Sequence, residues 1–413
     1  MNRNQFVLLV FLLVVLGLAG LMVYNKQNDM GRSGDPAIGT KLLGDLPVND
    51  VATISITQGT NQLALVKKDN LWRVHERNDY PANYSQISEF LLKARDLKII
   101  QSEHVGPSQL PRLELVPGPG TNAALVVDLK DQNDKTIRSL LLGKKHMQKP
   151  SQPSPAGDMG DSGGWPDGRY VKTATSSDTV ALISDALANL EPKPDQWLNK
   201  DFFRVERVRS IAVAGPAVTN SWKITRDTEN GEWKLVDCKT GEQLDTSKSS
   251  SAANALGSPA FSDVESGTKA AQFGLDKPTV VNLETFDDFS YTVNVGTKTN
   301  DAYAITLMVA AKIPSERTAG KDEKPDDKTR LDKEFKEKAK KLEEKLAQEK
   351  GYEKWVYLVS SWTLEPLLKD RAQLLVEKKE EPKKDAKGVP TAQTGLPVAP
   401  LTPPTATDPP EQQ

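Results

Sequence analysis

The chain repeats one order of short apolar runs, and this repetition constrains its fold more than any other feature. LLLGKK (residues 140–145) ends an apolar run in a glycine and a lysine, and VNVGTK (293–298) does the same in the second half. Upstream of each, WRVH (72–75) is matched by WKLV (233–236). The spacing is too long for a solenoid repeat. We therefore predict two similar domains in tandem.

Within each half, the pattern indicates antiparallel strands with packed helices. VATISITQ (51–58) alternates apolar and polar residues, and QLALVKKDNLWRVHE (62–76) adds two such runs around a Lys-Asp-Asn turn. Apolar residues then recur at helical spacing behind a plausible cap, Asn83. They are Ile87, Phe90, Leu91, Ala94 and Leu97. The fold class is therefore predicted to be α+β.

The ends of the two halves are predicted from their apolar runs. RYVKT (169–173) is expected to be a strand and TVALISDALANL (179–190) a helix, with WVYLVSSWTLEPLLKD (355–370) repeating both. Gly143 and Gly296 are expected to let each preceding strand leave its sheet at backbone angles that other residues resist.

The length of 413 residues is too great for one core, and two large domains fit it. The predicted segments are a membrane anchor (1–25), a linker (26–45), a first α+β unit (46–200), a second unit (201–376) with a helical insertion at about 316–351, and a tail (377–413). The tail is rich in proline and poor in large apolar residues, so we expect it to be disordered.

The N-terminal segment has the length of a membrane span. Residues 6–24, which begin with Phe6 and end with Tyr24, carry no charge, and a helix of that length nearly crosses a hydrocarbon core. A cleaved signal peptide is the alternative, but Met22, Val23 and Tyr24 stand where small residues would precede cleavage. We predict an uncleaved single-pass anchor in a bacterial inner membrane, with the bulk of the chain in the periplasm.

A Lys/Glu-rich segment, residues 327–350, interrupts the second half. Its apolar residues form one narrow helical stripe in a background suited to i,i+4 ion pairs: Leu331, Phe335, Leu342 and Leu346. The stripe is compatible with a solvated helix that lies on its own domain, or with a protrusion that binds a partner helix. These four residues are the candidate partner-binding site.

Composition argues against several functions. The net charge of −2 leaves no basic surplus for a phosphate backbone, so nucleic acid is not an expected partner. The single cysteine, Cys238, excludes an intrachain disulfide and is expected to be a half-buried strand residue. His75, His104 and His146 lack the spacing of a metal motif. We expect no cofactor, no metal and no catalytic residue.

Two further features have competing interpretations. Ser266 to Lys269 matches SxxK and Lys239 to Gly241 matches KTG, but their order in the chain is the reverse of that in penicillin-binding enzymes, which favours chance. Trp165, in GGWPDG, is either an exposed ligand contact or a plug that holds a long loop down, and we favour the plug.

Four stretches resemble one family. LPVNDVATISI, KKDNLWRVHERNDYPAN, EFLLKARDLKIIQSE, and LLLGKK followed by RYV resemble the bacterial domain of unknown function 4340 family, over roughly residues 46–190 and more loosely 203–370. The resemblance implies a membrane-anchored envelope protein with one N-terminal helix. Some members are associated with ABC-type export or gliding-motility components, and the family has no set of active residues.

Anchor and resemblance together predict a function. We expect a non-enzymatic accessory or scaffolding protein of an ABC-type transporter or envelope assembly, with a membrane or envelope protein as its partner. A periplasmic module that binds a glycan or a peptide is the alternative. It requires a deep apolar pocket between the two units, lined by aromatic residues such as Trp165 or Tyr303. A hydrolase would require Ser266 within reach of Lys269 and Lys239.

Overall fold

The computed structural model describes residues 38–120, 122–148, 165–173, 179–215, 221–320 and 323–377. The predicted anchor, most of the linker and the predicted tail from residue 378 onward lie outside these residues. In the described ranges, no helix combines the length and the apolar character needed to cross a lipid bilayer. Both sheets belong to one compact unit that ends at Leu375.

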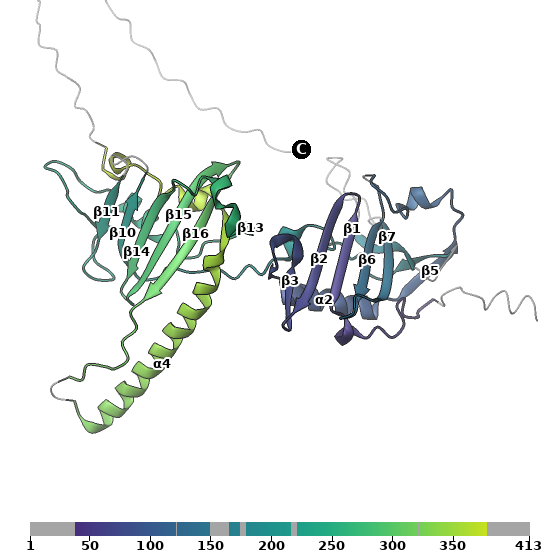
Figure 1. Cartoon of the computed structure of the whole chain (residues 1–413), viewed down its shortest axis with the longest axis horizontal. Helices are drawn as coiled ribbons and strands as arrows, with labels where there is room; N and C mark the ends of the chain where they lie inside the picture. Colours follow the sequence, from purple (N-terminus) through teal and green to yellow (C-terminus); the bar gives the residue numbers. More distant parts are fainter. Residues whose placement is uncertain are drawn as a thin grey trace, which may run out of the picture. The chain divides into compact units, whose positions relative to one another are not determined.

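The first sheet is antiparallel throughout, with the order β4-β3-β2-β1-β6-β7-β8-β9-β5 (Figure 1). Its strands are β1 (Thr53–Gln58), β2 (Asn61–Lys68), β3 (Leu71–Val74), β4 (Tyr80–Pro81), β5 (Ile99–His104), β6 (Leu125–Lys130), β7 (Thr136–Met147), β8 (Pro166–Thr173) and β9 (Thr179–Ile183). Asp69 and Asn70 both have positive φ, the geometry of a tight hairpin between β2 and β3. The predicted meander is confirmed.

The second sheet is also antiparallel, with the order β12-β11-β10-β14-β15-β16-β17-β13. Its strands are β10 (Val208–Ala214), β11 (Trp222–Thr225), β12 (Lys234–Leu235), β13 (Phe261–Ser266), β14 (Thr279–Thr285), β15 (Phe289–Thr299), β16 (Ala302–Ala311) and β17 (Trp355–Ser360). When β4 is left out, the strand order of the first sheet corresponds position by position to the strand order of the second sheet. The predicted α+β class with antiparallel sheets is therefore confirmed.

The strand registers of the two sheets agree in detail. The pairing of β5 with β9 shifts between Ile99 and Gln101, and the pairing of β13 with β17 shifts between Phe261 and Asp263. A second pair of shifts also matches. The pairing of β7 with β8 shifts between Leu142 and Lys145, and the pairing of β15 with β16 shifts between Val295 and Lys298. Because bulges are local features of a sheet, their recurrence fixes which residues correspond in the two halves.

Helices cover one face of each sheet. The α-helices are α2 (Tyr84–Asp96), α3 (Thr246–Asn254), α4 (Pro325–Lys350) and α5 (Ser361–Leu364). The side chain of Asn83 accepts a hydrogen bond from the backbone of Gln86 and caps α2, whose apolar face packs into the main core, as predicted. The 3-10 helices that matter below are η3 (Leu110–Leu113) and η6 (Gly267–Phe273).

Two predictions about the ends of the halves are wrong. TVALI is strand β9, not a helix, and all five of its residues are buried. The first sheet ends in the order β8-β9-β5, and the second sheet ends in the order β16-β17-β13. WVYLV (β17) therefore corresponds to β9, and β16 corresponds to β8. The expected match of WVYLV to RYVKT is therefore incorrect.

Gly143 and Gly296 act differently from the prediction. Neither has a positive φ, and β7 and β15 continue beyond them. A Cβ on Gly143 would lie 2.2 Å from the carbonyl oxygen of Leu113, at the end of η3. A Cβ on Gly296 would lie 2.2 Å from the carbonyl oxygen of Phe273, at the end of η6. Each glycine therefore permits a crossing chain to touch the strand.

Candidate functional site

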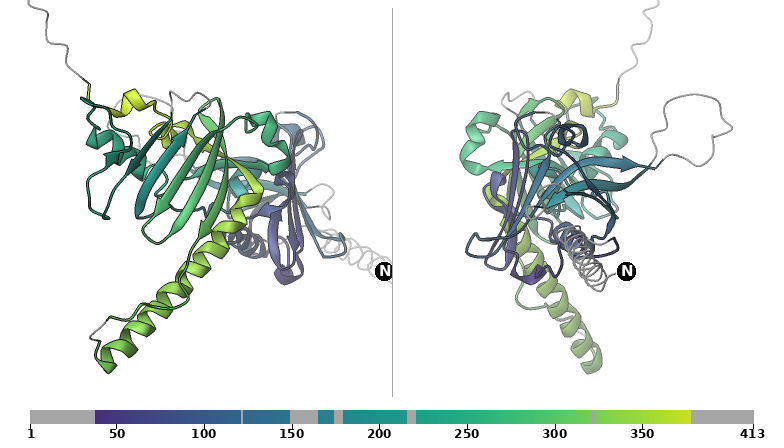
Figure 2. Two further views of the ribbon diagram at one scale, coloured as in Figure 1. Left: turned by 60° about the vertical axis from the view of Figure 1, so that its left-hand side comes forward. Right: turned by 90° about the vertical axis from the view of Figure 1, so that its right-hand side faces the viewer.

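Helix α4 is attached to the second sheet by only part of its length. Leu342 and Leu346 pack against the main core, whereas Leu331 and Phe335 are half-buried and lie nearer the other end of the helix. Figures 1 and 2 show α4 extending well beyond the strands. We call residues 325–337 of α4 the arm. The structure thus divides the four predicted partner-binding residues into two on the core and two on the arm.

A buried carboxylate fixes the end of α4 to the sheet. Glu349 is 4% exposed. Its Oε2 accepts a hydrogen bond of 2.8 Å from the Tyr291 hydroxyl of β15, and its Oε1 accepts bonds from Lys345 Nζ (2.9 Å) and the Arg204 backbone (3.1 Å). Burial and the neighbouring Glu349 raise the pKa of Tyr291, so the hydroxyl stays protonated as a donor.

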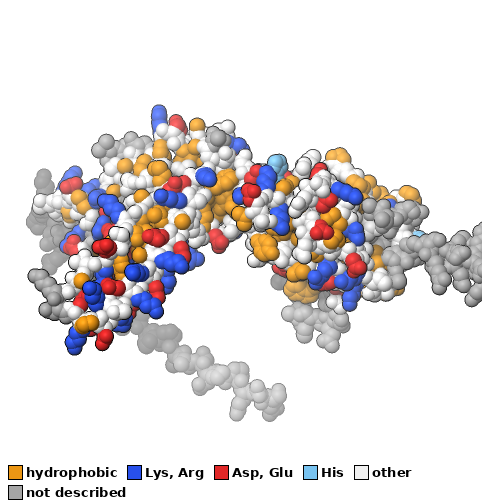
Figure 3. Space-filling view, turned by 60° about the horizontal axis from the view of Figure 1, so that its bottom comes forward, with side chains coloured by type: hydrophobic (Ala, Val, Ile, Leu, Met, Phe, Trp, Pro, Cys, Tyr) orange, Lys and Arg blue, Asp and Glu red, His pale blue; other side chains and the backbone are white. Residues whose placement is uncertain are grey.

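The arm has its own ion pairs. Arg317, in the segment that leads from β16 to α4, binds Glu323 through both terminal nitrogens and donates from Nε to Asp332 at 3.0 Å. Arg330 pairs with Glu334 at 2.9 Å. Basic and acidic side chains are interspersed over the face of the molecule seen in Figure 3. The arm is therefore a charged helix with two half-buried apolar side chains.

Asp287 ties α4 to the turn between β14 and β15. It accepts hydrogen bonds from Lys338 Nζ (2.8 Å) and Arg207 (2.6 Å). Burial raises the pKa of Asp287, but these two cations outweigh burial and the net pKa is lowered. The stability it contributes is therefore present above the unfolded pKa of about 3.9 and is lost as the pH falls through the lower folded pKa.

We expect Asp287→Asn to lower the free energy of unfolding by about 1 kcal/mol at neutral pH, since the carboxylate is partly exposed. Urea unfolding of the wild type and the variant between pH 7 and pH 3 measures this. The difference should be constant down to about pH 4 and shrink below it. A difference that grows on acidification would contradict this role of Asp287.

Trp165 is exposed over 85% of its surface at the start of β8. The predicted plug is therefore wrong, and ligand contact remains a prediction for this residue. Tyr303, in β16, is half-buried against the main core. Lys298 Nζ lies 5.9 Å from the centre of its ring.

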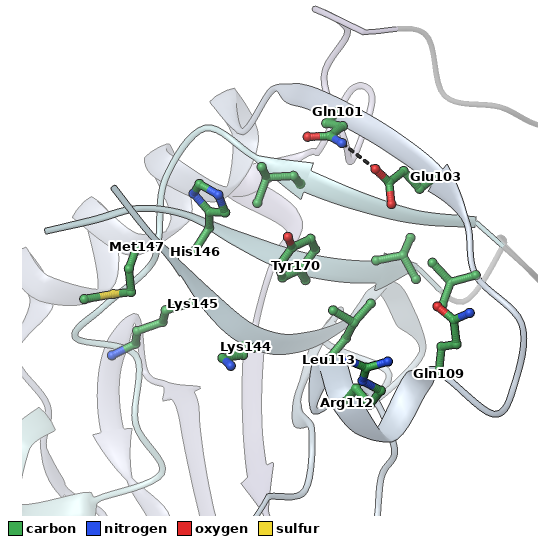
Figure 4. Close-up of a pocket in the computed structure, with 13 residues that line it drawn as sticks. Gln101, Glu103, Gln109, Arg112, Leu113, Lys144, Lys145, His146, Met147 and Tyr170 are labelled. Carbon is green, nitrogen blue, oxygen red and sulfur yellow. Dashed lines mark hydrogen bonds between the residues drawn. The ribbon is translucent and has the colours of Figure 1, made fainter. Parts of the chain in front are cut away.

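The first sheet has a cavity of about 560 Å³ (Figure 4). It lies on the face of the sheet that carries Val105 and Val180, opposite the face on which α2 packs. Strands β5, β7, β8 and β9 and the segment through η3 supply its walls. Tyr170 lies among the surrounding side chains. The lining residues are Gln101, Glu103, Val105, Gln109, Arg112, Leu113, Lys144, Lys145, His146, Met147, Tyr170, Val180 and Leu182. None of them was predicted as a site residue.

A small second core forms the apolar part of this cavity. Val105, Leu115 and Val180 are buried together, and Leu113 and Tyr170 pack against them. This cluster lies across the sheet from the main core, because alternate residues of β9 point to opposite faces. Both faces of β9 are therefore covered.

The polar part of the cavity is mostly basic. In the described part of the chain, neither Arg112 nor Lys144 has an ion-pair partner. His146 contacts Asp167 through Nδ1 at 2.6 Å and packs edge-on against Tyr170. Glu103, the acidic lining residue, accepts a hydrogen bond of 2.5 Å from Gln101.

A second cavity, of about 410 Å³, lies between α2 and residues 184–190. Glu89, Asp167 and Asp185 give it an acidic character, and Lys93 pairs with Glu89 at 2.9 Å. Lys93, the lysine that lines this cavity, is therefore already paired with a carboxylate that lines the same cavity.

The lysines of the SxxK and KTG matches lie in different elements, Lys269 in η6 and Lys239 after β12. Lys269 of the SxxK match pairs with Glu265 at 2.7 Å, and Lys239 lies in a turn. Among the described residues, no group of three His, Cys, Asp or Glu side chains could hold a metal ion. Cys238 is exposed and follows β12, so its prediction as a half-buried strand residue is wrong.

Comparison with known proteins adds one family. The model of the family described as domain of unknown function (DUF4340) matches residues 158–278. The match runs from β8 of the first sheet to η6 beside the second, and it supports the resemblance inferred from the sequence. No curated protein and no solved structure matches the chain.

Proposed function

We propose that the chain is a non-enzymatic accessory or scaffolding protein of a bacterial envelope assembly, with the components of an ABC-type transporter as its partners. In this proposal, residues 6–24 anchor it in the inner membrane and the described residues face the periplasm. The two sheets are two copies of one unit. Their matching strand orders and bulge positions support this duplication.

One observation carries the scaffolding role. The arm extends from the second sheet, and its Leu331 and Phe335 lie outside the main core. Leu342 and Leu346, farther along α4, pack against the main core. Helix-in-groove recognition uses apolar residues at this i,i+4 spacing. The arm is therefore suited to bind a groove or a helix of a partner protein.

Photocrosslinking in membranes tests this role. We expect benzoylphenylalanine at position 335 to crosslink to one membrane or envelope protein. The same probe at position 337, about 200° around the helix, should give no such product. Equal products at both positions, or none at either, would favour a solvated helix without a partner.

A matched pair of double variants separates binding from folding. Leu331→Ser with Phe335→Ser should abolish capture of that partner and change the free energy of unfolding by less than about 1 kcal/mol. Leu342→Ser with Leu346→Ser should lower the free energy of unfolding by about 3 kcal/mol or more, because these side chains pack on the core.

A further inference from the structure

The large cavity of the first sheet has the dimensions and chemistry of a small-molecule site. Its volume of about 560 Å³ lies within the usual range for such sites. One wall is apolar and contains Val105, Val180 and Leu182, with Tyr170 beside them. A flat apolar group can therefore pack against the aromatic ring and the aliphatic wall.

The cations of the cavity are available to a ligand. Within the described ranges, Arg112 and Lys144 form no ion pair, and His146 uses Nδ1 for Asp167. One oxygen of the Glu103 carboxylate accepts a hydrogen bond from the Gln101 amide. Arg and Lys beside an apolar wall favour an anionic head group.

The second sheet shows that the fold does not require this chemistry. Val171 pairs with Leu142, and Ile305 pairs with Val295, so the preceding residues, Tyr170 and Ala304, correspond. An alanine thus occupies the place of the aromatic ring.

A second lining residue of the cavity, Gln101, also differs in chemistry from its counterpart in the second sheet. The matched bulges place Asp263 where the first sheet has Gln101. Arg77 binds both carboxylate oxygens of Asp263 at 2.7 Å. In the second sheet this position is therefore used for an ion pair with Arg77 of the first half, whereas in the first sheet it borders the cavity.

We propose that this cavity binds a small molecule with an apolar, ring-sized body and an anionic head, either a carboxylate or a phosphate. The body packs on Tyr170, and the head is bound by Arg112 and Lys144. This ligand site is independent of the arm and of the scaffolding role.

Isothermal titration of the purified full chain tests the site with biphenyl probes. We expect 4-biphenylcarboxylate or 4-biphenylyl phosphate to bind with a dissociation constant below about 1 mM. The neutral 4-biphenylmethanol should bind at least tenfold more weakly. The comparison of the two anionic probes shows which head the cavity prefers. Equal binding of the neutral and anionic probes, or no binding of any, would overturn the proposal.

Variants locate the site. Arg112→Glu with Lys144→Glu should weaken binding of the anionic probe at least tenfold, and Tyr170→Ala should weaken all three probes. Alanine is compatible with this place in the fold, since Ala304 occupies it in the second sheet. Lys223→Glu, an exposed charge reversal in β11, is the control and should change affinity less than twofold. Unchanged binding in the double charge variant would place the probe elsewhere and overturn the assignment.

Discussion

Replacement of Gly143 by alanine is expected to lower the free energy of unfolding by about 3 kcal/mol or more, and Gly296→Ala should do the same. In each case the new methyl group would lie 2.2 Å from a backbone carbonyl oxygen, of Leu113 or Phe273. Backbone cannot rotate away as a flexible side chain can. Either the strand or the crossing segment must move by about 1 Å, which disrupts the packing around it.

Chemical denaturation of the single variants measures this cost. Gly351→Ala, after α4, and Gly106→Ala are the controls, because a Cβ at either position meets no atom within 4 Å and neither has a positive φ. Both should change stability by less than about 1 kcal/mol. If Gly143→Ala were as mild as the controls, the close approach of Leu113 would not explain the glycine.

This pair of glycines shows what the repeated sequence encodes. LLLGKK and VNVGTK lie in strands, β7 and β15, as predicted, but their glycines do not end those strands. A sequence reveals that a small residue is repeated, whereas it does not reveal which distant backbone passes over it. The partner carbonyls lie in η3 and η6, well before their glycines in the chain.

Local patterns predicted much of the fold. The alternation in β1 and β2, the Asp69-Asn70 turn and the capped helix α2 follow from side-chain period and turn chemistry. The sheet class also followed, because each half supplied several short alternating runs.

Strand β9 was mispredicted for a physical reason. TVALI has no period, since the main core covers one of its faces and the small core around Val105 covers the other. A continuous apolar run of this length fits a buried strand or a buried helix equally well. Pairing with β8 and β5 decides the outcome, and that pairing is not local.

The cavity was beyond sequence reasoning for a similar reason. Its walls come from β5, β7, β8, β9 and the η3 segment, so no short motif contains them. The available signal was the basic cluster Lys144-Lys145-His146, which directly follows the apolar run and the glycine of β7. From the sequence alone, we interpret this cluster only as the end of a strand.

We expect Glu349→Ala to be among the most damaging changes in α4 and the sheet on which it packs, at about 3 kcal/mol. The variant would leave the Arg204 backbone N–H without its acceptor, and the Tyr291 hydroxyl with only the longer contact, of 3.4 Å, to the Arg204 carbonyl oxygen. Glu349→Gln keeps an acceptor oxygen and should cost less, about 1–2 kcal/mol. The exposed Glu344→Ala, on the same helix and 3.8 Å from Lys340, is the control and should be nearly neutral.

The same change should release the arm. With Glu349 removed, the contacts left to hold α4 include Leu342 and Leu346, the Lys338–Asp287 pair and the hydrogen bond from Lys345 to the Arg204 carbonyl oxygen. Trypsin should therefore cleave the lysine-rich helix faster in Glu349→Ala than in Glu344→Ala, and the crosslink from position 335 should weaken because the arm no longer has a fixed direction. Equal cleavage rates in the two variants would mean that Glu349 does not set the direction of the arm. The other contacts of α4 would then be sufficient to hold the helix in place.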